Sequence, residues 1–294
     1  MKNIALKNFM QHTVCPVAAA VIWGTAFSAQ SICSQYMEPF SVNAARGLIA
    51  AAVLFLVCIL FRRKNSDRRS LLPGSLLCGV TLFIAGNLQQ LGIGATSAGK
   101  SGFVTALYIV LVPVTGLLFK KKTGKQVWIA VAVAVVGLYF LCVAEGDFTI
   151  GSGDAALLLC AAAFTAQILS VDYFAQRVDC FALSAGMFFV SGLLSAVCSL
   201  LFEHTGLADM RMCFGSVLYI ALFSSCIAYT LQIVAQKGGN PAVVSLLMSL
   251  ESVFALLGGV VILNEKMSPR ELVGCGIMAA AIVIAQIPEK KKRG

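Results

Sequence analysis

Two charged residues lie well inside long apolar stretches of this 294-residue sequence. Of its 22 Lys and Arg and 13 Asp and Glu residues, only Arg46 and Glu251 are placed in this way. A charged side chain at the centre of a bilayer costs at least ~2.5–3.5 kcal/mol. Both residues therefore mark positions with a chemical or structural task.

Glu251 is the deeper of the two. It lies ten residues into the apolar stretch 241–263, about 15 Å from the start of that stretch at the rise of an α-helix. A carboxyl group at this depth can exchange protons or hold the amine of a substrate. It can equally be a structural carboxyl that is hydrogen-bonded to a neighbouring helix, and the residue types leave both interpretations open.

Arg46 lies six residues into the stretch 40–61, roughly 9 Å deep by the same rise. Its long side chain can reach part of the way to the interface. We expect a structural or gating role for Arg46, with a helix carbonyl or Glu251 as its partner.

Uncharged polar residues supply further candidates for a binding cavity. Asn87, Gln89 and Gln90 cluster in the stretch 71–95, and Gln232 occupies the matching place later in the chain. Amides both donate and accept hydrogen bonds, which suits a polar or zwitterionic solute. Bonding between helices is the alternative for each single amide, but for the cluster we expect cavity lining.

Aromatic and small residues complete the candidate set. Trp23, Tyr108 and Tyr229 can form aromatic walls, although single aromatic residues in such stretches often face lipid or pack. Proline removes one backbone hydrogen bond and favours a bend, and glycine lets helices approach closely. The hinge candidates are Pro113, Gly258 and Gly259.

These residues are carried by long apolar stretches. The chain is 59% hydrophobic and 12% charged, against roughly 25% charged in soluble proteins, which excludes an ordinary soluble enzyme. A transmembrane helix needs about 20 apolar residues. We predict an all-α polytopic membrane protein with ten transmembrane helices, at 14–31, 40–61, 71–95, 101–119, 126–143, 154–173, 181–202, 213–235, 241–263 and 271–287.

Lys and Arg predict the orientation of these helices. Seventeen of them fall in the termini and in one set of alternate connectors, four fall in the other set, and Arg46 is the remaining one. The net charge of +9 therefore indicates the orientation of the chain in the membrane and not a surface that binds nucleic acid. We expect both termini in the cytoplasm, in a bacterial inner membrane.

An internal repeat divides the chain. Ala26-Phe27-Ser28-Ala29-Gln30 returns as Ala163-Phe164-Thr165-Ala166-Gln167 at an offset of 137, and Leu88-Gln89 matches Leu231-Gln232 at an offset of 143. Five helices per copy is an odd number, so the second copy enters from the other side, as in secondary transporters with inverted repeats. We predict two five-helix repeats, 1–150 and 151–294. Gln30 and Gln167 are then candidates for gating or for symmetric packing.

A set of motifs spans the whole chain: Trp23-Gly24-x-x-Phe27, Arg46-Gly47, Leu88-Gln89-x-x-Gly92, Thr96-Ser97-Ala98-Gly99, Leu111-Val112-Pro113, Leu250-Glu251 and Asn264-Glu265-x-x-Ser268-Pro269 before Gly274. This pattern resembles the EamA-type proteins of the drug/metabolite transporter superfamily. The resemblance implies ten helices in two repeats, a central substrate cavity and export of metabolites, amino acids or drugs. The family's usual Leu-Glu-Pro reads Leu250-Glu251-Ser252 here, which puts any kink at this point in question.

Other chemistry finds little support. His12 and His204 are the only histidines, and no hydrolase or nucleotide-binding motif is present. The eleven cysteines show no metal-ligand spacing. Cys33 and Cys213 both fall near connectors on the predicted outer side, where a disulfide and two free thiols are both conceivable.

The sequence thus predicts a secondary transporter without cofactor or metal. It would export a small-molecule solute by alternating access around a midplane cavity, with Glu251 as the candidate for proton coupling. A non-transporting receptor or scaffold and a channel are the alternatives. The expected surroundings are the lipid bilayer and no nucleic acid, and the expected state is a monomer or a homodimer.

Overall fold

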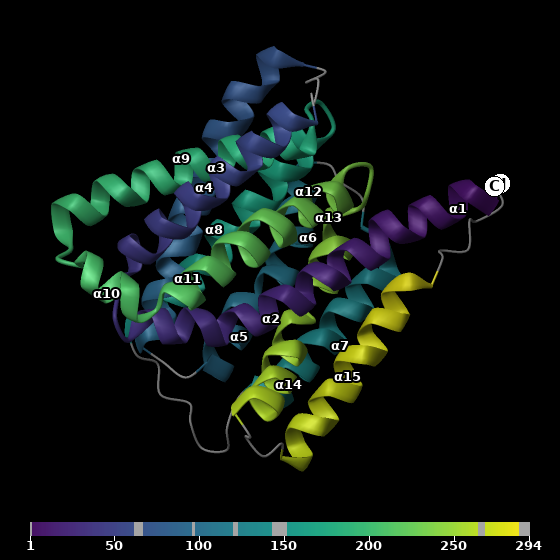
Figure 1. Ribbon diagram of the computed structural model, residues 1–294. Coiled ribbons are helices and arrows are strands. Elements are labelled where there is room, and N and C mark those ends of the chain that lie inside the picture. The colour runs from purple at the N-terminus through teal and green to yellow at the C-terminus, as the bar shows by residue number, and fades with distance from the viewer. Residues whose placement is uncertain are drawn as a thin grey trace.

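The computed structural model describes residues 2–61, 67–95, 98–119, 123–142, 152–263 and 268–287. Within these ranges the chain is helical and contains no strand. Its helices form one bundle (Figure 1). The basic clusters 62–64, 120–122 and 290–293 lie outside the described residues, so the orientation in the membrane stays a prediction.

Six helices are long and apolar enough to cross a membrane: Leu6–Ser34, Pro39–Leu60, Arg69–Ala95, Gly153–Ala175, Cys180–Phe202 and Phe214–Gln236. Shorter apolar helices cover Val104–Leu118, Lys125–Phe140 and Pro241–Leu257. A last helix, α15, spans Pro269–Gln286 and packs on α7 (Lys125–Cys142). The protein is thus a multi-pass membrane protein, and the number of ten crossings stays a prediction.

Several predicted helices are interrupted, which corrects the expectation of continuous spans. The stretch 101–119 divides into α5 (Ala98–Ala106) and α6 (Tyr108–Leu118). The stretch 241–263 divides into α13 (Pro241–Met248) and α14 (Glu251–Leu263). The stretch 213–235 contains α11 (Phe214–Tyr219), the π-helical segment η2 (Ile220–Ala228) and α12 (Tyr229–Gln236).

The break between α5 and α6 and the break between α13 and α14 have the same local cause, a turn tighter than an α-helix. Leu107 N–H donates to the carbonyl of Val104 at 3.2 Å, and Ser252 N–H donates to that of Ser249 at 3.2 Å. Both are three-residue hydrogen bonds of the 3₁₀ type. The α-helix is therefore interrupted just before Glu251 without a proline, and in the other stretch the break falls at Leu107 and not at Pro113.

Side chains define where the remaining long helices begin. Asp179 caps α9 (Cys180–Phe202) by accepting from two of its first amides. The start of α3 (Pro39–Leu60) is capped from a distance instead, because Glu203 accepts the amides of Phe40 and Ser41 at 2.7 Å each. A carboxylate at a helix start also interacts favourably with the helix dipole. This cap ties the first half of the chain to the second.

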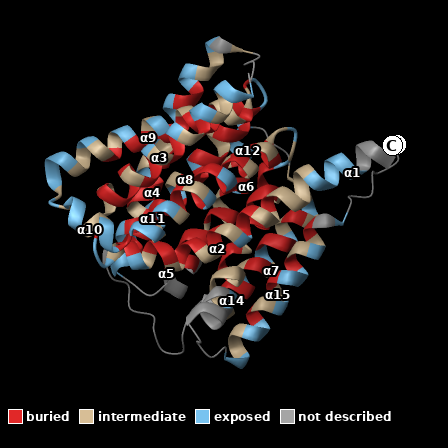
Figure 2. Cartoon of the chain, in the orientation of Figure 1, coloured by how far each residue is buried: buried red, intermediate tan, exposed pale blue. Residues whose placement is uncertain are grey.

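Packing follows the repeat. Helices α3 and α9 cross closely, because a Cβ atom on Gly47 would lie 2.8 Å from Cα of Gly192. Two further long helices, α4 (Arg68–Ala95) and α8 (Ser152–Ala175), pack against each other, and α4 also contacts α9. Helix α2 (Cys15–Ser34) packs on α14 and η2. Buried residues concentrate in the middle of the bundle, as Figure 2 shows, and large apolar side chains such as Leu200 face outward.

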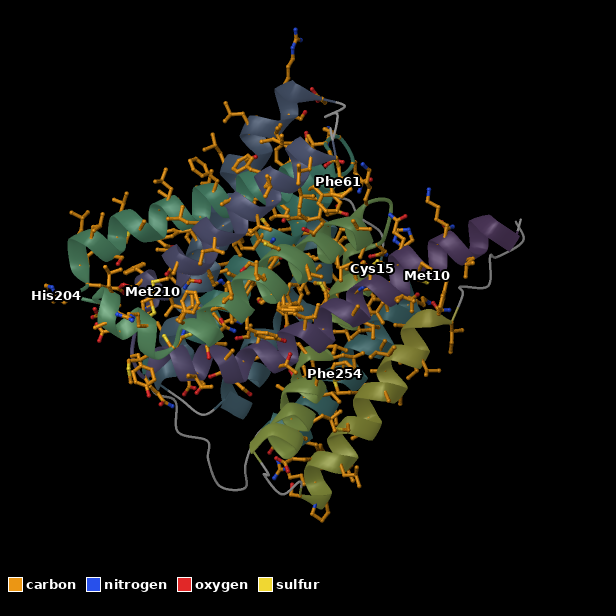
Figure 3. All side chains as sticks on the ribbon, in the orientation of Figure 1. Met10, Cys15, Phe61, His204, Met210 and Phe254 are labelled. Atoms are coloured by element: carbon orange, nitrogen blue, oxygen red, sulfur yellow. The ribbon has the colours of Figure 1, made fainter. Side chains whose placement is uncertain are left out.

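The bundle has two ends. Figure 3 places Met10, Cys15 and Phe61 toward one of them and His204 and Met210 toward the other. Two short elements lie at these ends: α1 (Lys2–Phe9), which continues through the π-helical segment η1 (Met10–Val14), and α10 (Leu207–Met212). We call the end with the N-terminus the terminal end and the other the opposite end. On the predicted orientation the opposite end faces outside.

Candidate functional site

A small cavity of about 40 Å³ lies at the centre of the bundle, lined by side chains from both halves of the chain. By the measure of ~10–15 Å³ per water molecule it has room for about three waters. Nine of the candidates from the sequence line it: Trp23, Gln30, Arg46, Gln89, Tyr108, Gln167, Tyr229, Gln232 and Glu251.

Glu251 is the first residue of α14 and follows the helix break directly. Its side chain is 6% exposed, and its Oε1 accepts a hydrogen bond from the Tyr108 hydroxyl at 3.3 Å. Tyr108 is itself the first residue of α6, after the other break. The two residues are 143 positions apart, the offset that also relates Gln89 to Gln232. The matching breaks of the two halves thus meet at the cavity.

Gly24 fixes how closely α2 approaches this break. A Cβ atom at Gly24 would lie 2.7 Å from the backbone oxygen of Glu251 and 2.5 Å from Cβ of Phe254. Only a residue without a side chain fits such a contact. The backbone of α2 at Gly24 therefore packs directly against the backbone of α14 at Glu251.

Arg46 is 4% exposed and donates from Nη1 to Oε1 of Gln30 at 3.2 Å. Its partner is thus a side-chain amide, where the sequence led us to expect a helix carbonyl or Glu251. Arg46 and Glu251 line the same cavity without a direct hydrogen bond between them among the described contacts.

Aromatic rings form one wall of the cavity. Trp23 meets Tyr229 edge to face, with ring centroids 4.9 Å apart, and Tyr229 meets Phe188 at 5.2 Å. The indole Nε1 of Trp23 donates to the backbone oxygen of Ser224, inside η2, at 3.3 Å. Edge-to-face contacts of this kind fix ring orientation. Tyr229 and Arg46 both line the cavity.

The amides of the second half form a chain of their own. Gln232 Nε2 donates to Gln167 Oε1 at 3.2 Å, and Gln167 Nε2 donates to the sulfur of Met187 at 3.6 Å. The Oε1 atom of Gln232 is buried and has no hydrogen-bond partner among the described residues. A buried unpaired acceptor is costly, so a water molecule or a solute donor is the natural occupant beside it.

Other candidates lie away from this cavity. Asn87 joins α3, α4 and α9, because it accepts from Asn43 at 3.1 Å and donates to Ser195 at 3.0 Å. Gln90 faces a different space, described below. Pro113 is buried within α6, six residues after the break at Leu107. Gly258 and Gly259 belong to α14, and their surroundings lie outside what the structure describes.

Six cavity residues were missed by the sequence analysis: Phe27, Thr105, Phe164, Ile168, Ser224 and Met248. Phe27 and Phe164 belong to the repeated five-residue motif, so their recurrence was a usable signal. Thr105 and Met248 are also related by the offset of 143. Ser224 had no signal, because a π-helical turn that re-aims a backbone carbonyl leaves no mark in composition.

Metal and disulfide chemistry can be judged for the described residues. They contain no group of three His, Cys, Asp or Glu side chains that could hold a metal ion. Cys33 and Cys213 are both buried and free, and they lie in one apolar cluster at the opposite end.

Comparisons with known proteins match this chain to transporters. A family model described as the EamA-like transporter family matches residues 14–143 and 151–286. An uncharacterized transporter from Archaeoglobus fulgidus is 30% identical, over 91% of this chain and 83% of that protein. The uncharacterized inner membrane transporter YedA of Escherichia coli strain K12 is 25% identical, over 92% and 89%. A solved structure with 19% identity has a TM-score of 0.79 and covers 94% of this chain and 96% of its own.

Proposed function

Because this chain belongs to the EamA-like transporter family, we propose that it is a secondary transporter that exports a small polar solute. The solute binds in the central cavity between the two halves of the chain. Its amine or other donor group bonds Glu251, and its polar groups bond the cavity amides. Amino acids, related metabolites and cationic drugs have this chemistry.

The observation that supports this proposal most is the meeting of two broken helices at a buried carboxylate. Broken helices are tolerated at membrane depth where they line a cavity, and transporters with repeated halves bind substrate at such breaks. Here both breaks lie at the cavity, and each places a polar side chain, Tyr108 or Glu251, at the start of its second half-helix.

The cavity volume supports a closed state. About 40 Å³ is far below the roughly 300–1,000 Å³ of a small-molecule site. The cavity must therefore widen before a solute enters. Relative movement of the two halves, exposing the cavity to one end at a time, provides that widening. A proton bound by Glu251 can compete with the solute amine and so couple the two fluxes.

Counterflow in proteoliposomes tests the proposal. Proteoliposomes that contain the purified protein and are loaded with an unlabelled amino acid or amine should accumulate the labelled solute. Glu251→Gln should reduce the counterflow rate at least tenfold and flatten its pH dependence. Glu271→Gln is the matched control, because Gln preserves the capping box with Ser268. Unchanged counterflow and an unchanged pH profile in Glu251→Gln would remove this residue from the mechanism.

The same preparation separates the other function classes. Sustained ohmic current without saturable exchange would identify a channel. Counterflow of no solute in a broad metabolite panel, together with a stable membrane partner, would identify a receptor or scaffold.

A further inference from the structure

A second hollow lies beside the central cavity. Its volume is about 560 Å³, and it occupies the opposite end of the bundle. We call it the vestibule. The connector after α2 and the last turns of α4 line it, including Ser34, Tyr36, Glu38, Gln90 and Gly94. Tyr36 and Glu38 are exposed, so the vestibule opens to the surroundings.

Gln90 forms the boundary between the vestibule and the cavity. It lines the vestibule, while the preceding residue, Gln89, lines the central cavity. Gln90 is 1% exposed, and its Nε2 donates to the backbone oxygen of Gln30 at 3.1 Å and to the Ser34 hydroxyl at 2.6 Å. The Gln30 side chain lines the cavity and accepts from Arg46. Gln90 therefore joins α4 to α2 between residues that line the two spaces.

The side-chain oxygen of Gln90, Oε1, takes no part in these hydrogen bonds. A backbone carbonyl can only accept, so the amide nitrogen must face Gln30 and the assignment of the amide is fixed. Gln90 Oε1 is buried and has no hydrogen-bond partner among the described residues. Glu38 adds a carboxylate to the same vestibule, with Oε2 accepting the His204 amide at 2.8 Å, and the described lining contains no Lys or Arg. The lining thus carries acceptors, of which Gln90 Oε1 is covered in this state and becomes available when the side chain moves.

The terminal end is closed in a different way. Gln236 Nε2 donates to the backbone oxygen of the cavity residue Ile168 at 2.8 Å. Gln176 Nε2 then donates to the backbone oxygen of Gln236 at 3.1 Å, and the amide of Gly238 donates to Gln176 at 3.0 Å. Gln11, from the N-terminal segment, donates to the backbone oxygen of Lys237 at 2.6 Å. Three glutamines share these hydrogen bonds at the terminal end, whereas Gln90 alone makes the described side-chain bonds between α2 and α4.

We propose that the vestibule is a second solute-binding site on the transport route, and that Gln90 is the gate between it and the central cavity. The site takes a hydrogen-bond donor, an ammonium or amide N–H, onto Gln90 Oε1. Capture of the donor draws Gln90 away from Gln30 and Ser34 and opens the passage. This inference rests on the proposed transport function for its direction, but the passage itself can be tested without a substrate.

Trp23 reports on access to the cavity. The chain has two tryptophans, so Trp128→Phe leaves Trp23 alone in the cavity wall. Iodide or caesium is added to the face of the opposite end, in proteoliposomes of known sidedness, and fluorescence quenching is measured. Gln90→Ala should raise the quenching constant on the order of fivefold, the factor that about 1 kcal/mol of lost hydrogen bonding gives.

Two variants keep the result interpretable. Gln236→Ala removes the matched glutamine of the terminal end and should leave quenching from the opposite end unchanged. Ser34→Ala removes one acceptor of Gln90 without altering α4, and it should give a smaller rise; it carries the test if Gln90→Ala does not fold. Caesium should gain more than iodide, because the vestibule presents acceptors.

The outcomes are distinct. Equal quenching in Gln90→Ala, Ser34→Ala and the parent protein overturns the gate, as does an equal rise in Gln236→Ala. A larger gain for iodide overturns the acceptor character of the vestibule. If no solute shows counterflow while the quenching difference persists, the transport function fails and the gated passage stands.

Discussion

The two halves of the chain present matching positions with different chemistry. In the first half Gln30 bonds Arg46; in the second half its counterpart Gln167 bonds Met187. Arg46 and Met187 are both the eighth residue of their helices, α3 and α9. The same amide thus meets a cation in one half and a thioether in the other. The first half supplies the positive charge of the cavity.

The broken helices show the converse difference. Tyr108 and Glu251 occupy the matching first positions of α6 and α14 and meet each other. Here the second half carries the negative charge and the first half carries a neutral hydroxyl. The two halves therefore share a backbone plan and divide the charges between them. On the proposed function, a solute with both donor and acceptor groups would meet both charges in one cavity.

Removing the charge of the first half should have the largest effect. Arg46→Met gives the first half the chemistry of the second and leaves Gln30 Oε1 without its donor. We expect counterflow to fall at least fivefold, the factor that corresponds to the lower end of the ~1–3 kcal/mol cost of an unpaired buried acceptor. Met187→Leu changes the matching position without a change of charge and should stay within about twofold. A similar loss in both variants would mean that packing at this position, and not charge, matters.

Close helix approach is the second difference. Gly24 matches Ala161 by the offset of 137. At Gly24, α2 lies nearer to α14 than a methyl group would allow. Gly24→Ala should destabilise the protein by ~1–3 kcal/mol, the usual cost of overpacking, with a lower melting temperature in detergent. Ala161→Gly should cost less, about 1 kcal/mol, by helix propensity. Equal shifts would contradict the different spacing of the two halves.

The smallest expected effect concerns the contact across the halves. Tyr108→Phe removes the 3.3 Å bond to Glu251 and keeps the ring. The bond is long, so we expect a change of a few fold in the counterflow rate, about 1 kcal/mol or less, with a shifted pH profile. Tyr219→Phe is the control, because it loses a bond to Thr25 outside the cavity. An unshifted pH profile in Tyr108→Phe would place the coupling elsewhere.

Much of this architecture was readable from the sequence, because the bilayer limits the structures available to an apolar chain. The repeat relates Gln30 to Gln167 and Gln89 to Gln232, and all four line the cavity. What failed was local geometry. The break at Leu107 arises from a three-residue hydrogen bond, and no residue type marks such a bond.

The neighbours Gln89 and Gln90 show the same limit from another side. Their types predict hydrogen bonding and nothing about direction. Adjacent residues on a helix point about 100° apart, since a turn has 3.6 residues, and the packing of α2 against α4 decides which compartment each one faces. A cluster that reads as one lining in the sequence is divided between two spaces in the structure.

The turn before Glu251 also sets how far α14 would move if the turn became α-helical. Ser252 is not proline, so its N–H can exchange the Ser249 carbonyl for that of Met248 and rewind the break into α-helix. A 3₁₀ turn rises about 2.0 Å per residue and an α-helix 1.5 Å, so rewinding three residues shortens the path by about 1.5 Å. A shift of about 1.5 Å is comparable with the difference between a formed and a lost hydrogen bond, so the state of this turn and the contact of Glu251 with Tyr108 would be linked.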